Sequence, residues 1–220
     1  MSELNAEISH FIGKWGEATE GHPLLYHLID SAAVAELLWQ KGLTPGARRQ
    51  FCDWLGLPAE DCGRLLAFWT SLHDLGKATP SFQAKHIPSK EQLTAMGFDF
   101  PFLAPAGIRH HSLLSQWILS DFNEILEIQP VRLFNLLRFA IGGHHGTFHI
   151  QEDQQQDLDR EKNLGGQRWS VARLELIQAL KTLMAPPRLM PLNLDQTEQN
   201  AFFNLLTGFF VSADWLASQD

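Results

Sequence analysis

The residues in this sequence most able to do chemistry are histidines. The chain of 220 residues contains ten histidines and a single tyrosine. One of them, His73, precedes Asp74 in the segment Leu72-His73-Asp74-Leu75-Gly76-Lys77. Imidazole is the commonest metal ligand in proteins, and carboxylates complete sites for hard or borderline cations. The pair is therefore a candidate metal site.

His73 and Asp74 are predicted to lie in the last turns of a buried helix that Gly76 ends. Neighbouring helical residues point about 100° apart, so both can reach one cation while the second oxygen of Asp74 reaches another. A bridging carboxylate suits two cations roughly 3.5–4 Å apart, an arrangement that assists phosphoryl hydrolysis. Because a His-Asp pair at a helix end can also serve only the helix dipole, the interpretation depends on other segments.

Three other segments offer imidazoles. His27 stands near the start of an amphipathic helix, although its apolar neighbours also fit an ordinary core histidine. Arg109-His110-His111 precedes another helical segment. His144 and His145 lie between glycines, whose backbone freedom lets both rings face one side. Two solvated histidines at a turn remain the alternative for that pair.

A second carboxylate comes from Asp214, which interrupts an otherwise apolar helix predicted over 201–216. A buried carboxylate without a partner is costly, so Asp214 either faces solvent or binds a cation or a donor. Its neighbours Phe210, Val211 and Trp215 favour an inward position. We therefore expect Asp214 to bind a metal.

The elements that must position these residues are helices. Strand alternation is nearly absent, which predicts an all-α fold forming one domain over 1–220. Two segments, 79–107 with four prolines and 147–167 rich in Gln, Asp and Glu, are predicted as long irregular loops. Apolar residues recur at helical spacing in the windows 24–39, 62–75, 113–126, 131–141, 171–183 and 201–216.

Charge and composition limit the partners. Lys and Arg total 17 and Asp and Glu total 25, so the formal net charge is −8. This charge opposes unaided binding to a polyanion, so a nucleic-acid substrate needs bound cations or a basic partner. The sequence has no apolar run long enough for a membrane span, no export signal and only Cys52 and Cys62. We expect a soluble protein of the reducing cytoplasm.

The order of these residues resembles the HD nuclease domain of the helicase-nuclease from type I CRISPR systems. The supporting strings are Leu72-His73-Asp74-Leu75-Gly76-Lys77 followed by Phe82-Gln83, then Gly143-His144-His145-Gly146, and Ser212-Ala213-Asp214-Trp215. The resemblance covers nearly the whole chain. It implies an HD-domain helical bundle that degrades single-stranded DNA in antiviral defence, together with a helicase domain or subunit and a CRISPR surveillance complex.

The resemblance also implies a ligand set for two divalent ions, with Mn, Fe, Ni or Co as the expected metals and Mg possible. One ion would take His27, His73, Asp74 and Asp214. The other would take Asp74, His111, His144 and His145.

Two assignments needed a choice. We prefer His111 to His110 as the ligand because Ser115 follows it by four residues, and a small residue one turn on lets the helix approach the site. Lys77 is expected beside the metals, where it would act on the scissile phosphate or orient water. A lysine that only complements a helix C-terminus is the alternative.

Two other functions remain open. The sequence also fits an HD phosphohydrolase of small nucleotides, which needs only His, His-Asp and Asp, and a non-catalytic helical interaction module. No glycine loop of the nucleotide-binding type is present, so a helicase motor must lie elsewhere. We expect either a stand-alone nuclease subunit or a domain separated from a helicase.

Overall fold

The computed structural model describes residues 7–15, 21–129, 131–148, 159–190 and 192–219. Helices dominate these ranges, as predicted, and the described sheet is a single antiparallel pair, β1 (Ile12–Lys14) with β2 (His22–Pro23). The longer helices are α2 (Leu24–Leu37), α3 (Pro45–Leu55), α4 (Ala59–Ser71), α6 (Ile87–Ala95), α7 (His111–Asp121), α9 (Val131–Gly142), α12 (Gln167–Met184) and α13 (Gln196–Ala217). The all-α fold is confirmed.

Short elements join these helices. They are the 3-10 helices η1 (Ile8–His10), η3 (Leu75–Lys77) and η4 (Pro105–Gly107), the π-helical η2 (Leu38–Gly42), and the short helices α5 (Pro80–Gln83), α8 (Asn123–Leu126) and α11 (Arg160–Leu164).

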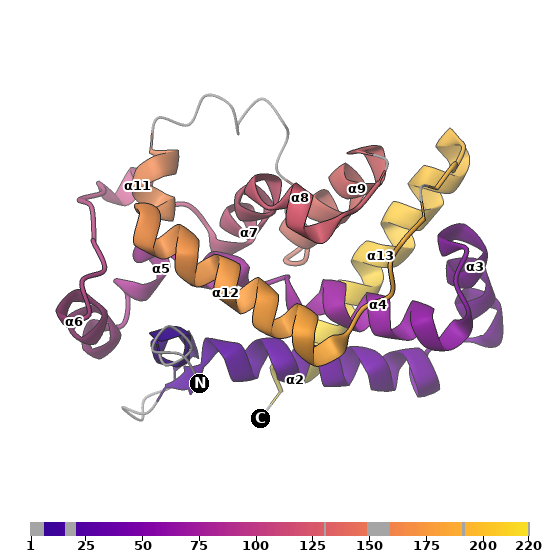
Figure 1. Cartoon of the computed structure of the whole chain (residues 1–220), viewed down its shortest axis with the longest axis horizontal. Helices are drawn as coiled ribbons and strands as arrows, with labels where there is room; N and C mark the ends of the chain where they lie inside the picture. The colour runs from indigo at the N-terminus through magenta and orange to yellow at the C-terminus, as the bar shows by residue number, and fades with distance from the viewer. Residues whose placement is uncertain (1–6, 16–20, 130, 149–158, 191, 220) are drawn as a thin grey trace.

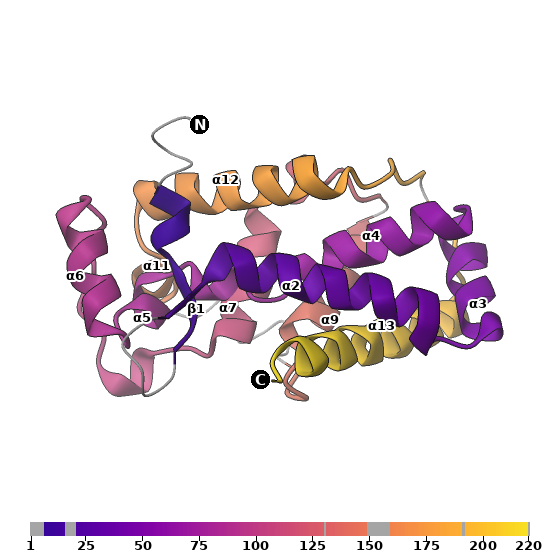
Figure 2. The ribbon, with the colours of Figure 1, turned by 90° about the horizontal axis from the view of Figure 1, so that it is seen from below.

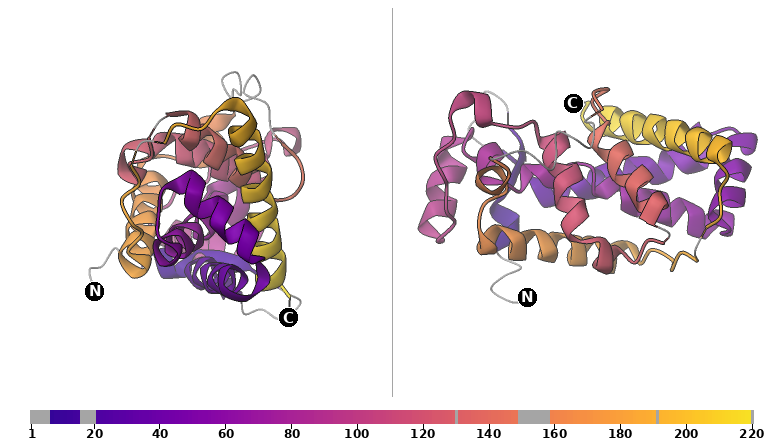
Figure 3. Two further views of the ribbon diagram at one scale, coloured as in Figure 1. Left: turned by 90° about the vertical axis from the view of Figure 1, so that its right-hand side faces the viewer. Right: turned by 90° about the horizontal axis from the view of Figure 1, so that it is seen from above.

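The helices pack as a bundle elongated along α2 and α12, which run along the long axis (Figures 1 and 2). Helix α4 packs against both, and α13 lies across α2 on one side and α9 on the other. Figure 3 shows α13 and α9 side by side. Helix α7 packs on α9 and on η3. The short segment after α4 is therefore enclosed by helices that are distant in sequence.

Helix α4 is the buried centre of the bundle. Nine of its thirteen residues are buried, including the polar Thr70 and Ser71. Their hydroxyls are satisfied locally, because Thr70 Oγ1 donates to the Leu66 carbonyl (2.8 Å) and Ser71 Oγ to that of Phe68 (2.6 Å). A buried helix with no unpaired hydroxyl at its end is a rigid support for the segment that follows it.

The end of α4 corrects one prediction. The helix stops at Ser71, so His73 and Asp74 lie in the turn beyond it and Gly76 does not end the helix. The backbone changes to i→i+3 bonds there, with the His73 amide donating to the Thr70 carbonyl (3.1 Å). This tighter turn is a common way for a helix to end. The two side chains diverge because of the turn and not because of helical spacing.

The predicted loops also need correction. Segment 79–107 contains α5 and α6, because Pro80 and Pro88 stand in first turns, where a missing N–H is harmless. Within 147–167, α11 is helical and residues 149–158 lie outside the described part. The predicted helix over 113–126 is interrupted at Phe122, which separates α7 from α8.

Candidate metal centre

The seven predicted ligands come together from five elements. His27 projects from α2, His73 and Asp74 from the turn after α4, His111 from the start of α7, His144 and His145 from the turn after α9, and Asp214 from α13. The two pairs of adjacent residues, His73 with Asp74 and His144 with His145, each lie in a turn after a helix. The packing of the helices therefore determines the distances between the ligands.

Asp74 occupies the centre. Its Oδ2 lies 2.9 Å from His27 Nε2 and 3.2 Å from His73 Nε2. Its Oδ1 lies 3.2 Å from His111 Nε2 and 3.5 Å from His144 Nε2. The two oxygens of a single carboxylate thus face two different sets of imidazoles.

Those two sets agree with the predicted division, with one difference. The ligand atoms of His27, His73, Asp74 and Asp214 lie within 4.8 Å of one another, as do those of Asp74, His111 and His144. His145 does not share a group with Asp74. It lies instead in one group with His110 and His111 and in another with His144 and Asp214.

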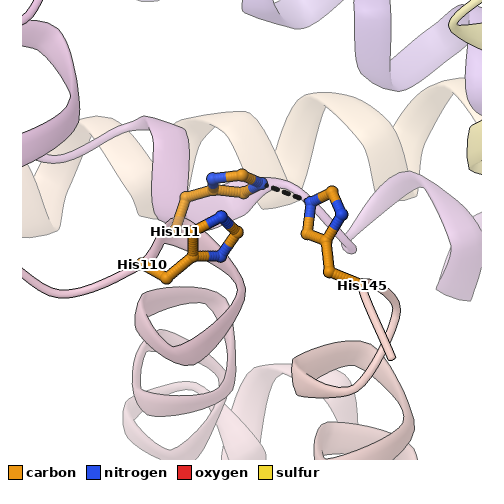
Figure 4. Close-up of side chains that lie close together, drawn as sticks. All are labelled: His110, His111 and His145. Atoms are coloured by element: carbon orange, nitrogen blue, oxygen red, sulfur yellow. Dashed lines mark hydrogen bonds between the residues drawn. The ribbon is translucent and has the colours of Figure 1, made fainter. Parts of the chain in front are cut away.

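Figure 4 shows His110, His111 and His145, whose imidazoles lie close together. His111 Nε2 points to His145 Nε2 at 2.9 Å. His110 caps α7, where its Nδ1 accepts from the Ser112 amide (3.4 Å), and its ring stays 5.0 Å from that of His145. Of the two candidates, His111 contacts Asp74. Its choice as ligand remains a prediction, because His110 stays within reach of the same group.

The carboxylates favour a cation. Burial alone would raise the pKa of Asp74, but His73, Lys77 and His111 hold it well below its usual value. Burial also acts against ionisation of Asp214, yet His73 lowers the pKa of Asp214 to about 2. Both carboxylates are therefore ionised at neutral pH and available to a metal ion.

Most imidazoles are held neutral, the form that binds metals. Burial lowers the pKa of His27 and His111 despite the nearby Asp74. Burial, followed by neighbouring imidazoles, lowers the pKa of His110 and His145 to about 4. His73 differs: burial would lower its pKa, but Asp74 and Asp214 together raise it to about 10. Negative potential is thus concentrated at His73.

Two buried atoms show that the residues present fit a cation. Asp74 Oδ1 and His144 Nε2 are buried, have no hydrogen-bond partner among the described residues and lie 3.5 Å apart. The Nδ1 atoms of His73 and His144 donate to the carbonyls of Thr70 (2.8 Å) and Ile141 (2.5 Å). This second bond fixes the ring and directs Nε2 into the cluster, as in metal sites with histidine ligands.

Two further side chains contact the carboxylates of the cluster. Lys77 Nζ lies 2.6 Å from Asp74 Oδ2, and Ser218 Oγ donates to Asp214 Oδ1 (3.2 Å). Gln83, in the Phe82-Gln83 string, has a structural role that its residue type did not predict. Its buried side-chain amide donates to the carbonyls of Lys77 (2.8 Å) and Ile12 (2.9 Å) and so ties η3 to β1.

Ser115 shows why a small residue follows His111 by one turn. Its hydroxyl donates to the His111 carbonyl (3.0 Å) and accepts a hydrogen bond from the buried Gly76 amide (2.8 Å). The close contact between α7 and η3 therefore depends on a small side chain that is also polar.

Replacing Ser115 with alanine is expected to reduce the free energy of unfolding by about 1–3 kcal/mol, because the Gly76 N–H loses its acceptor. Urea unfolding measures this cost. The matched control is Ser120→Ala in the same helix, where an exposed residue loses only a bond to its own helix. Equal effects of the two substitutions would contradict the role of Ser115.

The helical fold and this cluster of histidines and aspartates define the class of the protein: a metal-dependent hydrolase of the HD type. The family described as "Cas3, HD domain" matches residues 13–220. The chain belongs to that family.

Individual Cas3 proteins are similar to this chain in sequence and in structure. The chain is 29% identical over 197 residues to the CRISPR-associated endonuclease/helicase Cas3 of Thermus thermophilus, covering 90% of this chain and 21% of that protein. The chain thus spans about a fifth of the length of this curated relative. The structure of T. fusca Cas3 superposes with a TM-score of 0.76 at 27% identity, over 97% of this chain and 23% of that one.

A third relative is close to this chain in extent. The Thermus thermophilus cas3 HD domain, solved in the presence of Ni²⁺, superposes with a TM-score of 0.69 at 25% identity, over 99% of this chain and 78% of that one.

Among the described residues, no helix combines the length and apolar character needed to cross a bilayer.

Proposed function

We propose that this chain is a nuclease that hydrolyses single-stranded DNA by means of two divalent cations. The single observation that carries the proposal is the position of Asp74, whose two oxygens face separate groups of imidazoles. A structural metal site needs one closed set of ligands, whereas a shared carboxylate suits two ions acting on one phosphate.

The ligand assignment follows from the two groups. One ion would be held by Asp74 together with His27, His73 and Asp214. The other would be held by Asp74 with His111 and His144, and His145 shares a group of ligand atoms with each of these two histidines. Mn, Fe, Ni or Co suit this mixture of nitrogen and oxygen ligands, and Mg remains open. When bound, such ions lower the pKa of water and neutralise charge on the scissile phosphate.

The side chains of the protein supply the rest. Asp74 and Asp214 provide the negative charge that holds cations, and the carbonyls of Thr70 and Ile141 orient the imidazoles. Lys77 is only 13% exposed and lies against Asp74, where its ammonium group can contact a phosphate oxygen. No residue of the cluster needs to act as a covalent nucleophile.

The wider role belongs to the same proposal. The Thermus thermophilus relative is named an endonuclease/helicase, and the family is CRISPR-associated. We infer that this chain acts with a helicase domain or subunit and a CRISPR surveillance complex in antiviral defence. Its net charge of −8 supports this, because partners must help to bring the polyanion to the site.

The substrate is tested by parallel turnover assays with Mn²⁺ on single-stranded DNA and on free nucleoside triphosphates. We expect cleavage of the DNA and intact nucleotides. Rapid nucleotide hydrolysis with intact DNA would instead identify a small-molecule phosphohydrolase, and no turnover of either substrate would favour an interaction module.

Metal loading is expected to stabilise the protein. An ion at 100 times its dissociation constant adds about 2.7 kcal/mol per site, or a rise in Tm of roughly 5–11 °C for a chain of this size. Thermal melts with Mn²⁺ and with a chelator measure the difference. The shift should be lost in Asp74→Asn, and an unchanged Tm in the native protein would contradict metal binding.

A further inference from the structure

The candidate metal centre has a closed end and an open end. His27, His73 and His144 are buried, whereas His110 and His145 are exposed and His111 is intermediate. Figure 4 shows His110, His111 and His145 grouped at this open end. The side with these three imidazoles therefore offers a DNA strand an approach to the centre.

Phe82 forms the wall of the centre next to that opening. Its buried ring meets the His111 ring edge-on at 5.6 Å and lies 5.7 Å from Lys77 Nζ. The ring thus touches one proposed ligand and the one lysine in contact with Asp74.

Two side chains of a different kind also contact the Phe82 ring. The partly exposed indole of Trp15 meets the ring edge-on at 5.4 Å, and Lys85 Nζ lies 5.2 Å from the ring centroid. The ring of His86 also packs against the Trp15 indole, with 5.6 Å between the ring centroids. Trp15 belongs to the segment after β1, while Lys85 follows α5, so the fold has brought an aromatic and a cation together.

Lys85 brings a positive charge to this ring. In the part of the chain that the structure describes, no carboxylate lies within ion-pair distance of its ammonium group. The Lys85 ammonium lies 5.2 Å from the Phe82 ring, and that ring also contacts His111 at 5.6 Å, so the positive charge of Lys85 is close to the open end of the centre.

We propose that Trp15 and Lys85 form a binding subsite for the nucleotide adjacent to the scissile phosphate, with the indole stacking on its base and the ammonium group contacting its phosphate. The inference rests on the proposed function. Aromatic rings beside cations bind single strands of any sequence, because every base has a π-face and every nucleotide a phosphate. The subsite also gives an acidic chain a local attraction for a polyanion.

The subsite is tested with two substrates of different size. A single-stranded oligonucleotide engages both the metal centre and the subsite, whereas bis(p-nitrophenyl) phosphate is a phosphodiester too small to need the subsite. The variants are Trp15→Ala, Trp15→Phe and Lys85→Ala. Lys41→Ala, an exposed lysine at the far end of the α2 segment, is the control for loss of one charge.

Strand binding is measured by fluorescence anisotropy with Ca²⁺ in place of Mn²⁺, and turnover with Mn²⁺. Trp15→Ala is expected to weaken binding and raise KM for the oligonucleotide by roughly 5- to 100-fold, with Trp15→Phe close to the native protein. Lys85→Ala should make the slope of log K against log salt less steep by about 0.7, the value for one phosphate contact on a single strand. Lys41→Ala should change neither quantity.

Hydrolysis of bis(p-nitrophenyl) phosphate should be unchanged in every variant. Unaltered oligonucleotide binding and salt dependence in Trp15→Ala and Lys85→Ala would overturn the subsite while leaving the nuclease proposal intact. A parallel loss of both activities would also overturn it, because Trp15 would then only support the fold. If the native protein hydrolyses neither substrate, the nuclease proposal fails, and the binding measurements still decide the subsite.

Discussion

Asp74→Asn is expected to slow hydrolysis of single-stranded DNA by about a thousandfold or more. Asparagine keeps the size of the side chain but removes the charge that faces both imidazole groups. Metal ions contribute several kcal/mol to phosphoryl hydrolysis, and about 4 kcal/mol corresponds to three factors of ten in rate. Single-turnover kinetics with Mn²⁺ measure this effect without interference from product release.

The matched control is Asp30→Asn. Asp30 lies on the same helix as His27 and also pairs with a histidine, His22, at 3.0 Å, but on the exposed surface. The Asp30→Asn protein should cleave DNA at the native rate. Full activity in Asp74→Asn would rule out a mechanism that depends on this carboxylate.

Gly76→Ala is expected to cost about 3 kcal/mol or more of folding free energy and to abolish activity. An added Cβ would stand 1.9 Å from the His111 carbonyl oxygen and 2.7 Å from the Ser115 nitrogen, where ordinary contact begins near 3.4 Å. Both are backbone atoms of α7 and cannot rotate away, so η3 and α7 must separate. That separation moves Asp74 away from His111 and breaks the Gly76–Ser115 bond.

Urea unfolding measures the cost, with Gly208→Ala as the control. A Cβ at Gly208, in the middle of α13, meets no atom within 4 Å. Because alanine favours helices over glycine, this control should be more stable by roughly 0.5–1 kcal/mol. A Gly76→Ala protein as stable as the native one would show that η3 and α7 are not tightly packed.

The sequence predicted the chemistry of the centre better than its local geometry. The inward position of Asp214 followed from a carboxylate in an apolar helix, and the structure places it 3.1 Å from His73. The end of α4 was misplaced because apolar residues continue through Leu75 although the helix stops at Ser71. Periodicity detects which residues are buried, but a 3-10 turn buries Leu72 and Leu75 equally well.

Distances between residues that are far apart in the chain could not be predicted from the sequence. The sequence showed that His111 and His145 carry ligand groups, but their separation of 2.9 Å depends on how α7 packs on α9. The prolines of segment 79–107 suggested a loop because their position relative to helix starts is not visible in composition. The expectation of a single domain stays a prediction, and the continuous buried core is consistent with it.

The central claim is that Asp74 bridges two cations, and anomalous diffraction from crystals soaked with Mn²⁺ tests it most directly. The predicted result is two anomalous peaks, each at coordination distance from one oxygen of Asp74. One peak would lie among His27, His73 and Asp214, and the other beside His111 and His144. A single peak, or two peaks of which only one touches Asp74, would contradict the shared-carboxylate mechanism.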